Sequence, residues 1–304
     1  MQFSGLSAFP LTPFTHTADG GEEVDERAFA ALIERLADAG VDSIAALGST
    51  GSYAYLSVAE RARVAEVAVQ HAGDTPVIVG VGALRTRDVL ANIAHAESAG
   101  AAALLLAPLA YQPLTDDDVY GLFRAASEAS ELPVIVYDNP ATTHVTFTLE
   151  LYARIAALPG IASFKIPGIP LEENEFRARV EQIRAVIPEH VTIGISGDAV
   201  ATTGLLAGCD AWYSVIGGTL PEPALRITRA SLAGDRVTAR AESDRLAPLW
   251  RLNAELGGSL RVVAAVAEHL GLAPARCLPL PLEGLTAADR ARVAEALKRI
   301  ETRD

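Results

Sequence analysis

One lysine stands out in a chain that otherwise relies on arginine for positive charge. Only two of the 25 Lys and Arg residues are lysines, Lys165 and Lys298. Lys165 ends a short apolar run, residues 161–165. Arginine stays protonated in proteins, whereas a desolvated lysine can lose its proton and attack a carbonyl carbon. The pattern therefore admits two interpretations: a nucleophilic amine, or a strand-end lysine that points to solvent.

Two further groups have residue types that would assist such an amine. Gly48-Ser49-Thr50-Gly51 offers hydroxyls and closely approachable backbone N–H groups, which suit a carboxylate. Tyr137 could relay a proton beside the amine. Each group also has a structural interpretation, as a turn that needs only glycine or as a tyrosine that packs at a rim. Phe164 and Ile166 flank Lys165 and give it surroundings that disfavour its charged form.

Short apolar runs alternate with helical patterns along the first 233 residues. Such continuous runs are typical of strands buried on both faces of a parallel sheet. A capping box at residues 57–60 and an acidic first turn after Thr115 mark two helix starts. The predicted strands are residues 6–10, 43–47, 77–80, 103–107, 133–137, 161–165, 191–195 and 211–215. The predicted helices are residues 25–39, 57–71, 87–98, 115–130, 149–157, 171–187, 199–207 and 221–233, with a polar turn at 15–21.

Eight strand–helix units predict an α/β fold, a closed (β/α)8 TIM barrel, over residues 1–233. The alternative is a doubly wound open sheet, which would carry Gly-x-Gly-x-x-Gly after its first strand; the chain has no such motif there. After about residue 234 the pattern contains helices only, at 236–256, 259–270 and 286–301. We expect residues 234–304 to form a C-terminal helical appendage packed on the barrel.

The unusual residues fall where such a barrel carries its chemistry. Catalytic groups of TIM barrels lie at the C-terminal ends of the strands and in the loops that follow. Ser49 and Thr50 follow the second predicted strand, Tyr137 closes the fifth and Lys165 closes the sixth. We therefore expect all four at the same mouth of the barrel, with Tyr137 and Lys165 on neighbouring strands.

Composition excludes several classes of partner. Half of the residues are hydrophobic, and the formal net charge is −13 with a pI near 4.9. Non-specific binding to nucleic acid or to anionic membranes needs a basic surface, so neither partner is expected. No apolar stretch is long enough to span a bilayer. The start of the chain lacks the pattern of a signal peptide, and the two cysteines, Cys209 and Cys277, provide no disulfide framework. We expect a cytoplasmic protein.

The turn at residues 48–51, the Tyr137-x-x-Pro140 element and Lys165 together resemble the dihydrodipicolinate synthase / N-acetylneuraminate lyase family of Schiff-base-forming aldolases. The resemblance runs from residue 6 to the C-terminal helices and includes Ser57-Val58-Ala59-Glu60-Arg61 and Ser196-Gly197-Asp198. It implies a Schiff base between Lys165 and a pyruvate-type 2-keto acid.

The resemblance also assigns the remaining roles. It implies that Ser49 and Thr50 hold the substrate carboxylate and that Tyr137 shuttles a proton. It further implies a homotetramer or homodimer. The chemistry that it implies needs no metal and no organic cofactor.

Some positions depart from the family's pattern. Dihydrodipicolinate synthases carry an arginine two residues after the Tyr-x-x-Pro element, where this chain has Thr142. They also carry a relay tyrosine after the fourth strand, where this chain has Ala110, with Tyr111 displaced by one. These differences point away from dihydrodipicolinate synthesis. The sequence Pro140-Ala141-Thr142-Thr143 looks more like the members that act on 2-keto-3-deoxy sugar acids, and we expect Thr143 to bind a substrate hydroxyl.

Other departures concern the shape of the pocket. His144 stands where glycine is usual, and Ser52 replaces the usual acidic residue after Gly51. Trp212 and Tyr213 on the eighth strand are expected to add bulk, and Tyr213 to contact the substrate. The six histidines form neither His-x-His nor His-Glu-x-x-His, so the sequence gives no support for a catalytic metal site.

Three hypotheses follow. The first is a lyase that makes or breaks a C–C bond, or removes water, through a Lys165 imine; the runner-up within it is a condensation of the dihydrodipicolinate synthase type. The second is a non-catalytic protein that binds a keto acid or sugar acid. The third is a phosphate-dependent barrel enzyme, which the absence of Lys and Arg from the loops at 196–198 and 217–219 disfavours.

Overall fold

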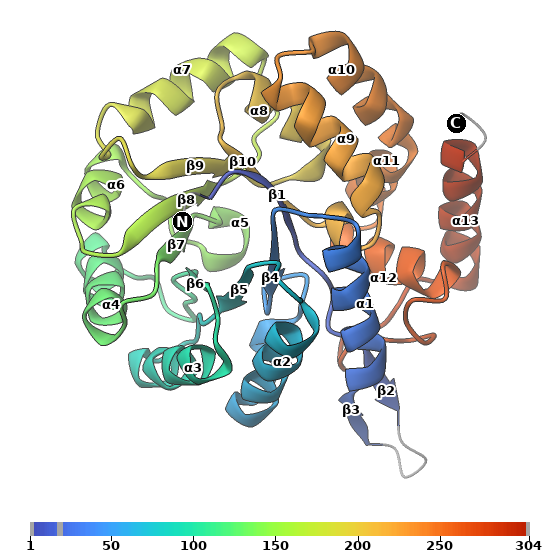
Figure 1. Cartoon of the computed structure of the whole chain (residues 1–304), viewed down its shortest axis with the longest axis horizontal. Coiled ribbons are helices and arrows are strands. Elements are labelled where there is room, and N and C mark those ends of the chain that lie inside the picture. The colour runs from blue at the N-terminus through green and yellow to red at the C-terminus, as the bar shows by residue number, and fades with distance from the viewer. Residues whose placement is uncertain (1–2, 17–20, 302–304) are drawn as a thin grey trace.

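A computed structural model describes residues 3–16 and 21–301, and it confirms the predicted barrel. Eight parallel strands close on themselves in the order β1-β10-β9-β8-β7-β6-β5-β4, and helices surround them (Figure 1). The strands are β1 (Gly5–Ala8), β4 (Ser43–Ala46), β5 (Val77–Gly80), β6 (Ala103–Leu106), β7 (Val134–Tyr137), β8 (Ile161–Ile166), β9 (Thr192–Ile195) and β10 (Ala211–Ser214).

The strands bury both faces, which explains their continuous apolar runs. One set of side chains fills the interior of the barrel, and includes Phe9, Ile78, Leu105, Ile135 and Tyr213. The other set packs outward against the helices and belongs to the larger core cluster. Because side chains alternate along a strand, each short apolar run serves two cores at once.

The surrounding helices follow the predicted positions. The capping box expected at Ser57 is formed, and Thr115, which precedes the expected acidic first turn, also forms a capping box with Asp118. The helices up to the end of the barrel are α1 (Glu26–Asp38), α2 (Val58–His71), α3 (Thr86–Ala99), α4 (Asp116–Ala129), α5 (Pro140–Thr143), α6 (Leu149–Ala156), α7 (Glu173–Arg184), α8 (Ala201–Leu206) and α9 (Pro221–Leu232). Single 3-10 turns occur at η1 (Tyr53–Tyr55), η2 (Asp198–Val200) and η3 (Ile216–Gly218).

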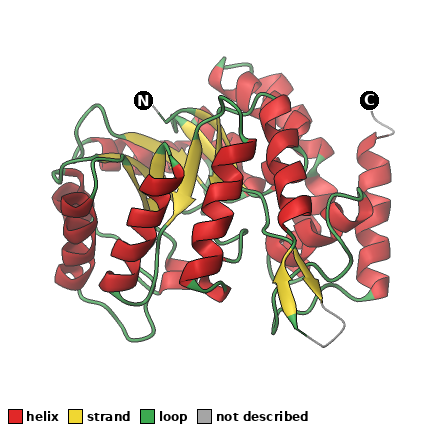
Figure 2. Cartoon of the chain, turned by 60° about the horizontal axis from the view of Figure 1, so that its bottom comes forward, coloured by secondary structure: helices red, strands yellow, loops and turns green. Residues whose placement is uncertain are grey.

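The predicted polar turn at residues 15–21 is flanked by a small hairpin that the sequence pattern did not reveal. Strands β2 (Phe14–His16) and β3 (Glu22–Val24) pair antiparallel and project from the barrel below α1 (Figure 2). Residues 17–20 lie outside the described part of the chain. The Phe14 N–H donates to the Cys277 carbonyl (2.9 Å), which ties the hairpin to the C-terminal region. Three-residue polar strands carry too little alternation to be recognised.

The C-terminal segment is helical, as expected, and packs on one side of the barrel (Figure 1). It comprises α10 (Arg236–Arg245), α11 (Ala247–Glu255), α12 (Ser259–His269) and α13 (Ala287–Glu301). The prediction of one helix over 236–256 is wrong, because the helix breaks at Leu246. Pro248 causes this break, since proline has no N–H to donate and its ring clashes with the preceding turn.

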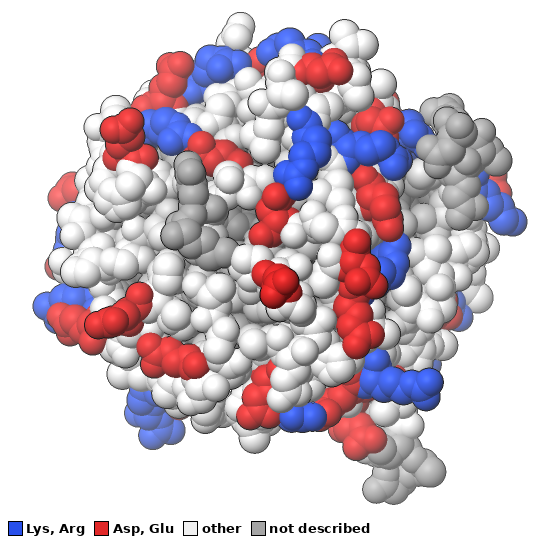
Figure 3. Space-filling model, viewed as in Figure 1, with Lys and Arg blue, Asp and Glu red and all other residues white. Residues whose placement is uncertain are grey.

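Charged side chains of both signs are interspersed on the surface shown in Figure 3. Arginines pair with nearby carboxylates, for example Arg229 with Asp42 (2.8 Å) and Arg184 with Asp210 (2.7 Å). Cys209 and Cys277 are buried, and neither forms a disulfide within the described residues. Within the described residues, no helix has both the length and the apolar character needed to cross a bilayer.

Candidate active site

Lys165 is buried at the C-terminal end of β8, and it does not point to solvent. Its side chain is only 3% exposed. The register pairs Tyr137 of β7 directly with Lys165, as the chain order predicted. The Lys165 Nζ lies 4.0 Å from the ring centroids of both Phe9 and Tyr137, and 5.9 Å from that of Tyr213. The amine is thus enclosed by aromatic rings on several sides.

This enclosure changes the protonation of the amine. Burial lowers the pKa of Lys165 to about 7, while the negative charge of Asp198 acts in the opposite direction. The aromatic faces also favour the cation, but by about 0.5–2 kcal/mol each, which is less than the cost of removing an ammonium from water. A substantial fraction of Lys165 is therefore a neutral amine at physiological pH, the form that attacks carbonyl carbons.

A strained turn presents Ser49 and Thr50 to the same cavity. Leu47, the residue after β4, has φ of +58°, a left-handed conformation that non-glycine residues adopt at a cost. Its carbonyl oxygen would lie 1.8 Å from a Cβ on Gly80, so only glycine fits on the neighbouring strand. The Thr12 hydroxyl donates to the Gly51 carbonyl (2.9 Å) and holds the other end of the turn. Strand packing therefore fixes the turn that carries the two hydroxyls.

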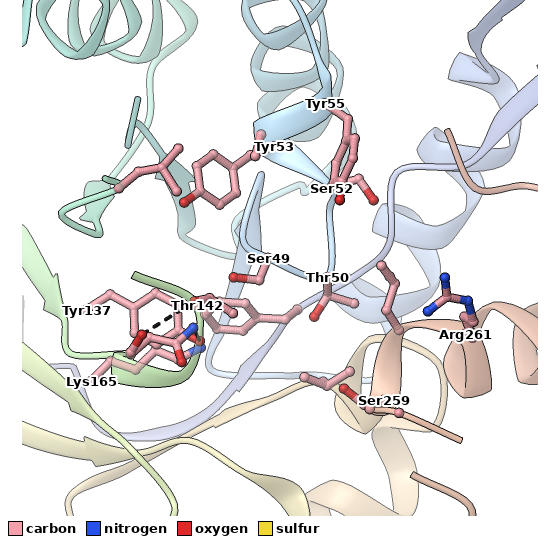
Figure 4. Close-up of a pocket in the computed structure, with 18 residues that line it drawn as sticks. Ser49, Thr50, Ser52, Tyr53, Tyr55, Tyr137, Thr142, Lys165, Ser259 and Arg261 are labelled. Carbon is pink, nitrogen blue, oxygen red and sulfur yellow. Dashed lines mark hydrogen bonds between the residues drawn. The ribbon is translucent and has the colours of Figure 1, made fainter. Parts of the chain in front are cut away.

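Tyr137 lies between this turn and the amine. Burial raises the pKa of its phenol, and a hydrogen bond with Ser49 partly offsets that increase. The Asn139 side-chain amide donates to the Tyr137 hydroxyl (2.9 Å), a bond drawn dashed in Figure 4. The phenol is consequently protonated, held in place, and able to give or take a proton within the cavity.

Two adjoining cavities meet at Lys165, and we call them the first and second lobes. The first lobe has a volume of about 410 Å³ and the second about 500 Å³. Lys165, Tyr137, Asn139, Val215 and Ser259 line both. Figure 4 shows the first lobe, with Lys165, Tyr137 and Thr142 grouped together and Ser49 and Thr50 beside them. Both volumes lie in the range of small-molecule sites.

Not every residue singled out in the sequence lines these lobes. The Thr143 hydroxyl is buried and donates to the Asn139 carbonyl (2.9 Å), which stabilises α5. Thr142 takes the cavity-facing position instead, and His144 lines neither lobe. His144 follows α5 in a left-handed conformation (φ +58°). Glycine adopts this conformation readily, so it would also fit at this position.

The two aromatic residues on β10 point in opposite directions. Tyr213 lines the second lobe, and its hydroxyl lies 2.7 Å from Ser163 Oγ inside the barrel. The expectation that Trp212 adds bulk to the pocket is wrong. Its side chain packs outward, and its indole N–H donates to Asp198 (3.1 Å). Alternation along the strand sends one ring inward and the other outward.

Asp198, from the Ser-Gly-Asp motif, has a positioning role. Its buried carboxylate accepts hydrogen bonds from Trp212, from the Ser214 hydroxyl (3.2 Å) and from the backbone N–H groups of Val215 (3.1 Å) and Ile216 (2.7 Å). These bonds fasten the end of β9 to the loop after β10, which forms a wall shared by the two lobes.

Other lining residues were missed because they come from segments that the strand pattern does not mark. Tyr53 lies under the guanidinium of Arg61, which donates to the carbonyls of Gly82 and Gly80 (2.8 Å each). Arg261, on α12, lines the first lobe. Trp250 and Asn253, on α11, line the second lobe, and Trp250 Nε1 and Asn253 Oδ1 are buried without a hydrogen-bond partner among the described residues. Their positions depend on how the C-terminal helices pack.

The donor set does not resemble a metal site. No cluster of three or more His, Cys, Asp or Glu side chains suited to a metal ion occurs among residues 3–16 and 21–301. The polar side chains that line the first lobe carry hydroxyls, the Asn139 amide, the Lys165 amine and the Arg261 guanidinium, and the one carboxylate that lines the second lobe, that of Asp198, is engaged by four hydrogen bonds within the protein.

Comparison with known proteins identifies the family. The model of the Dihydrodipicolinate synthetase family matches residues 2–300. A 4-hydroxy-tetrahydrodipicolinate synthase of Hyphomonas neptunium is 36% identical over 255 residues, with 82% of each chain covered. A protein of the same name from Phenylobacterium zucineum is 30% identical over 299 residues, with 97% of each covered.

Solved structures agree with this assignment. A dihydrodipicolinate synthase of Agrobacterium tumefaciens is 43% identical and superposes with a TM-score of 0.92, with 98% of both chains covered. A dihydrodipicolinate synthase of Acinetobacter baumannii, solved with pyruvate, is 27% identical with a TM-score of 0.87 over 99% of both chains. This chain belongs to the dihydrodipicolinate synthetase family of Schiff-base-forming lyases.

Proposed function

We propose that the protein acts on a 2-keto acid, of the pyruvate or 2-keto-3-deoxy sugar acid type, through an imine on Lys165. The observation that carries this proposal is the burial of the Lys165 amine among aromatic rings, with its pKa lowered to about 7, at the junction of two cavities. The pyruvate bound to the related Acinetobacter baumannii enzyme supports the same class of ligand.

The proposed chemistry begins with the neutral Lys165 amine attacking the keto carbon, and the loss of one water leaves a protonated imine. The cationic nitrogen withdraws electrons, so that a bond beta to the imine carbon can break and leave an enamine. Tyr137 exchanges the proton with the leaving or attacking oxygen. Ser49 and Thr50 hold the carboxylate next to the keto carbon.

The second lobe supports a substrate longer than pyruvate. Trp250 Nε1 and Asn253 Oδ1 are a buried donor and a buried acceptor, and neither has a hydrogen-bond partner in the part of the chain that the structure describes. Unpaired buried polar atoms cost free energy unless a ligand or water satisfies them. Hydroxyl groups of a sugar acid would supply the missing partners. Thr142 provides a further hydroxyl, in place of Thr143.

A second candidate is condensation of the dihydrodipicolinate synthase type, which the names of the relatives favour. In that reaction the enamine of pyruvate would attack an aldehyde, using the same imine and the same phenol. The two candidates differ in the preferred direction of the reaction and in the molecule that reacts with the enamine. A non-catalytic binding role is disfavoured, because Lys165 and Tyr137 remain paired in the cavity.

Trapping the imine tests the proposal. The protein is incubated with pyruvate and with longer 2-keto acids, reduced with borohydride, and analysed by intact mass and peptide mapping. We expect an adduct on the peptide that contains Lys165. The chain offers a matched pair of variants, because Lys298 is its only other lysine: Lys165→Arg should lose the adduct and Lys298→Arg should keep it. An adduct that persists in Lys165→Arg would overturn the proposal.

Products then separate the two candidates. A 2-keto-3-deoxy sugar acid supplied alone should be converted, either to pyruvate and an aldehyde or to a dehydrated acid. If the sugar acid is unchanged while pyruvate and an aldehyde are joined, condensation is the function.

We further propose that the chain is cytoplasmic and assembles as a homotetramer or homodimer. Tyr111 and Leu84 are 87% and 62% exposed, on the loops after β6 and β5. Large apolar side chains on neighbouring loops are typical of protein contact surfaces. Light scattering on the purified protein, compared with a Tyr111→Ser variant, measures the assembly, and a monomeric wild-type protein would contradict this part.

A further inference from the structure

The first lobe carries one cationic group that the proposed chemistry does not use. Arg261, near the start of α12, lines the lobe together with Ser259. In Figure 4, Arg261 lies well away from Lys165, with Thr50 between them. Its Nε donates to the Glu283 carbonyl (2.8 Å), which anchors the guanidinium through one edge. No carboxylate among the described residues pairs with it.

The lining around Arg261 is suited to a negative charge. The first lobe contains no Asp or Glu among its lining residues, although the chain as a whole has a net charge of −13. Ser52 lines this lobe, and its hydroxyl is buried with no hydrogen-bond partner in residues 3–16 and 21–301. The first turn of α12 also lies there, and the N–H groups of a first turn have no partner within the helix.

The geometry of the substrate separates two anionic positions. The carboxylate next to the keto carbon must stay within one bond of the carbon that joins Lys165, so it belongs beside Ser49 and Thr50. A group that reaches Arg261 is therefore a second one, at the far end of the substrate. Ser259 lines both lobes, so a substrate that passes Ser259 can place its far end at Arg261 in the first lobe while its hydroxyl groups face Trp250 and Asn253 in the second.

We propose that Arg261 forms a distal subsite for a carboxylate, and that the substrate is a 2-keto dicarboxylic acid. This inference rests on the proposed 2-keto acid function and specifies its substrate class. A guanidinium presents a planar fork that matches a carboxylate. A carboxylate carries one charge, which one guanidinium balances, whereas a phosphate group carries about −1.5 to −2 and would be left partly uncompensated.

Calorimetric titration with acids of matched length tests the subsite. The probes are 2-oxoadipate, which ends in a carboxylate, and 2-oxohexanoate, which has the same number of carbons and ends in a methyl group. The wild-type protein should bind 2-oxoadipate at least about tenfold more tightly, the range expected for a charge-assisted hydrogen bond. Arg261→Gln should bring the ratio of the two affinities close to one, and Arg261→Lys should keep part of it.

Arg290→Gln is the matched control. Arg290, on α13, pairs at 3.8 Å with Glu268 of α12, the helix that also carries Arg261, and Arg290 is not among the described residues that line the two lobes. This control should preserve the affinity ratio, and thermal unfolding should show that all variants are folded. Equal affinity of the wild-type protein for both acids, or an unchanged ratio in Arg261→Gln, would overturn the inference.

Borohydride trapping of the same acids keeps the two proposals separate. Preferential binding of 2-oxoadipate without an adduct on Lys165 would support the distal subsite and refute the imine. Adducts with both acids at equal affinity would support the imine and refute the subsite.

Discussion

The rate of imine formation should follow the titration of Lys165, with an inflection close to pH 7. The reacting species is the neutral amine, so the rate is proportional to the fraction of Lys165 that has lost its proton. Burial lowers the pKa from the ordinary 10.5 to about 7. The test therefore varies only the pH of the reaction and uses the wild-type protein without any substitution.

The shift has a large effect at neutral pH. An amine with a pKa of 10.5 is neutral in about one molecule in three thousand at pH 7, whereas a pKa of about 7 makes about half of the molecules reactive. The structure thus predicts that burial increases the fraction of reactive amine at pH 7 by roughly a thousandfold. In free energy, the shift of 10.5 to about 7 corresponds to about 5 kcal/mol of preference for the neutral form.

The assay measures single-turnover trapping of pyruvate from about pH 5.5 to 9.5. Below the inflection, the logarithm of the rate should rise by one for each pH unit, and above it the rate should level off. The Lys298→Arg variant is the control, because it leaves one lysine in the chain, and its profile should be the same. A rate that keeps rising to pH 9.5 with no plateau would refute the argument that burial activates the amine.

Three further predictions concern the groups around this amine. Tyr137→Phe should lower turnover about 10²- to 10⁴-fold while borohydride still traps an adduct on Lys165, because the phenol transfers the proton and does not form the imine; loss of trapping would contradict this division. Asp198→Asn removes a charge that favours the ammonium, so the inflection should move below pH 7; a move to higher pH would contradict the sign. Lys165→Met should raise the free energy of unfolding at pH 7 by as much as about 4 kcal/mol. The unfolded lysine keeps its proton up to about pH 10.5, but the folded one only to about pH 7, so the stability of the wild-type protein rises with pH across that window. The stability advantage of Lys165→Met over the wild-type protein should therefore shrink toward pH 10. Urea denaturation of both proteins at pH 7 and pH 10 measures this difference.

The sequence was sufficient for the barrel because the strands are buried on both faces. All eight apolar runs became strands, with ends that differ by at most a few residues. The neighbourhood of Tyr137 and Lys165 was also predictable, since consecutive strands of a parallel barrel pair with each other. Local patterns and chain order carry this information, so no long-range contact had to be known.

Features that depend on tertiary packing were not predictable. Thr142 and Thr143 are adjacent and chemically alike, and only the winding of α5 decides which hydroxyl faces the cavity. Trp212 and Tyr213 are also adjacent, and the alternation of side chains along β10 decides which of the two rings faces the interior of the barrel. Arg261 lies almost a hundred residues beyond Lys165 on a helix that the sequence pattern treats as an appendage. Its position requires knowing how α12 packs.

The burial of Lys165 explains why the chain keeps a lysine at this position while it uses arginine almost everywhere else. An arginine at the end of β8 would remain charged in the same enclosure, so it would bear the full cost of desolvation and still could not attack a carbonyl. Lysine avoids part of that cost by releasing its proton, and the released form is the reactive one. Lys298, the other lysine, is exposed on α13, where arginine and lysine serve equally well. Composition alone cannot distinguish the two lysines. The difference arises from the barrel, which places one of them among aromatic rings at the junction of two cavities.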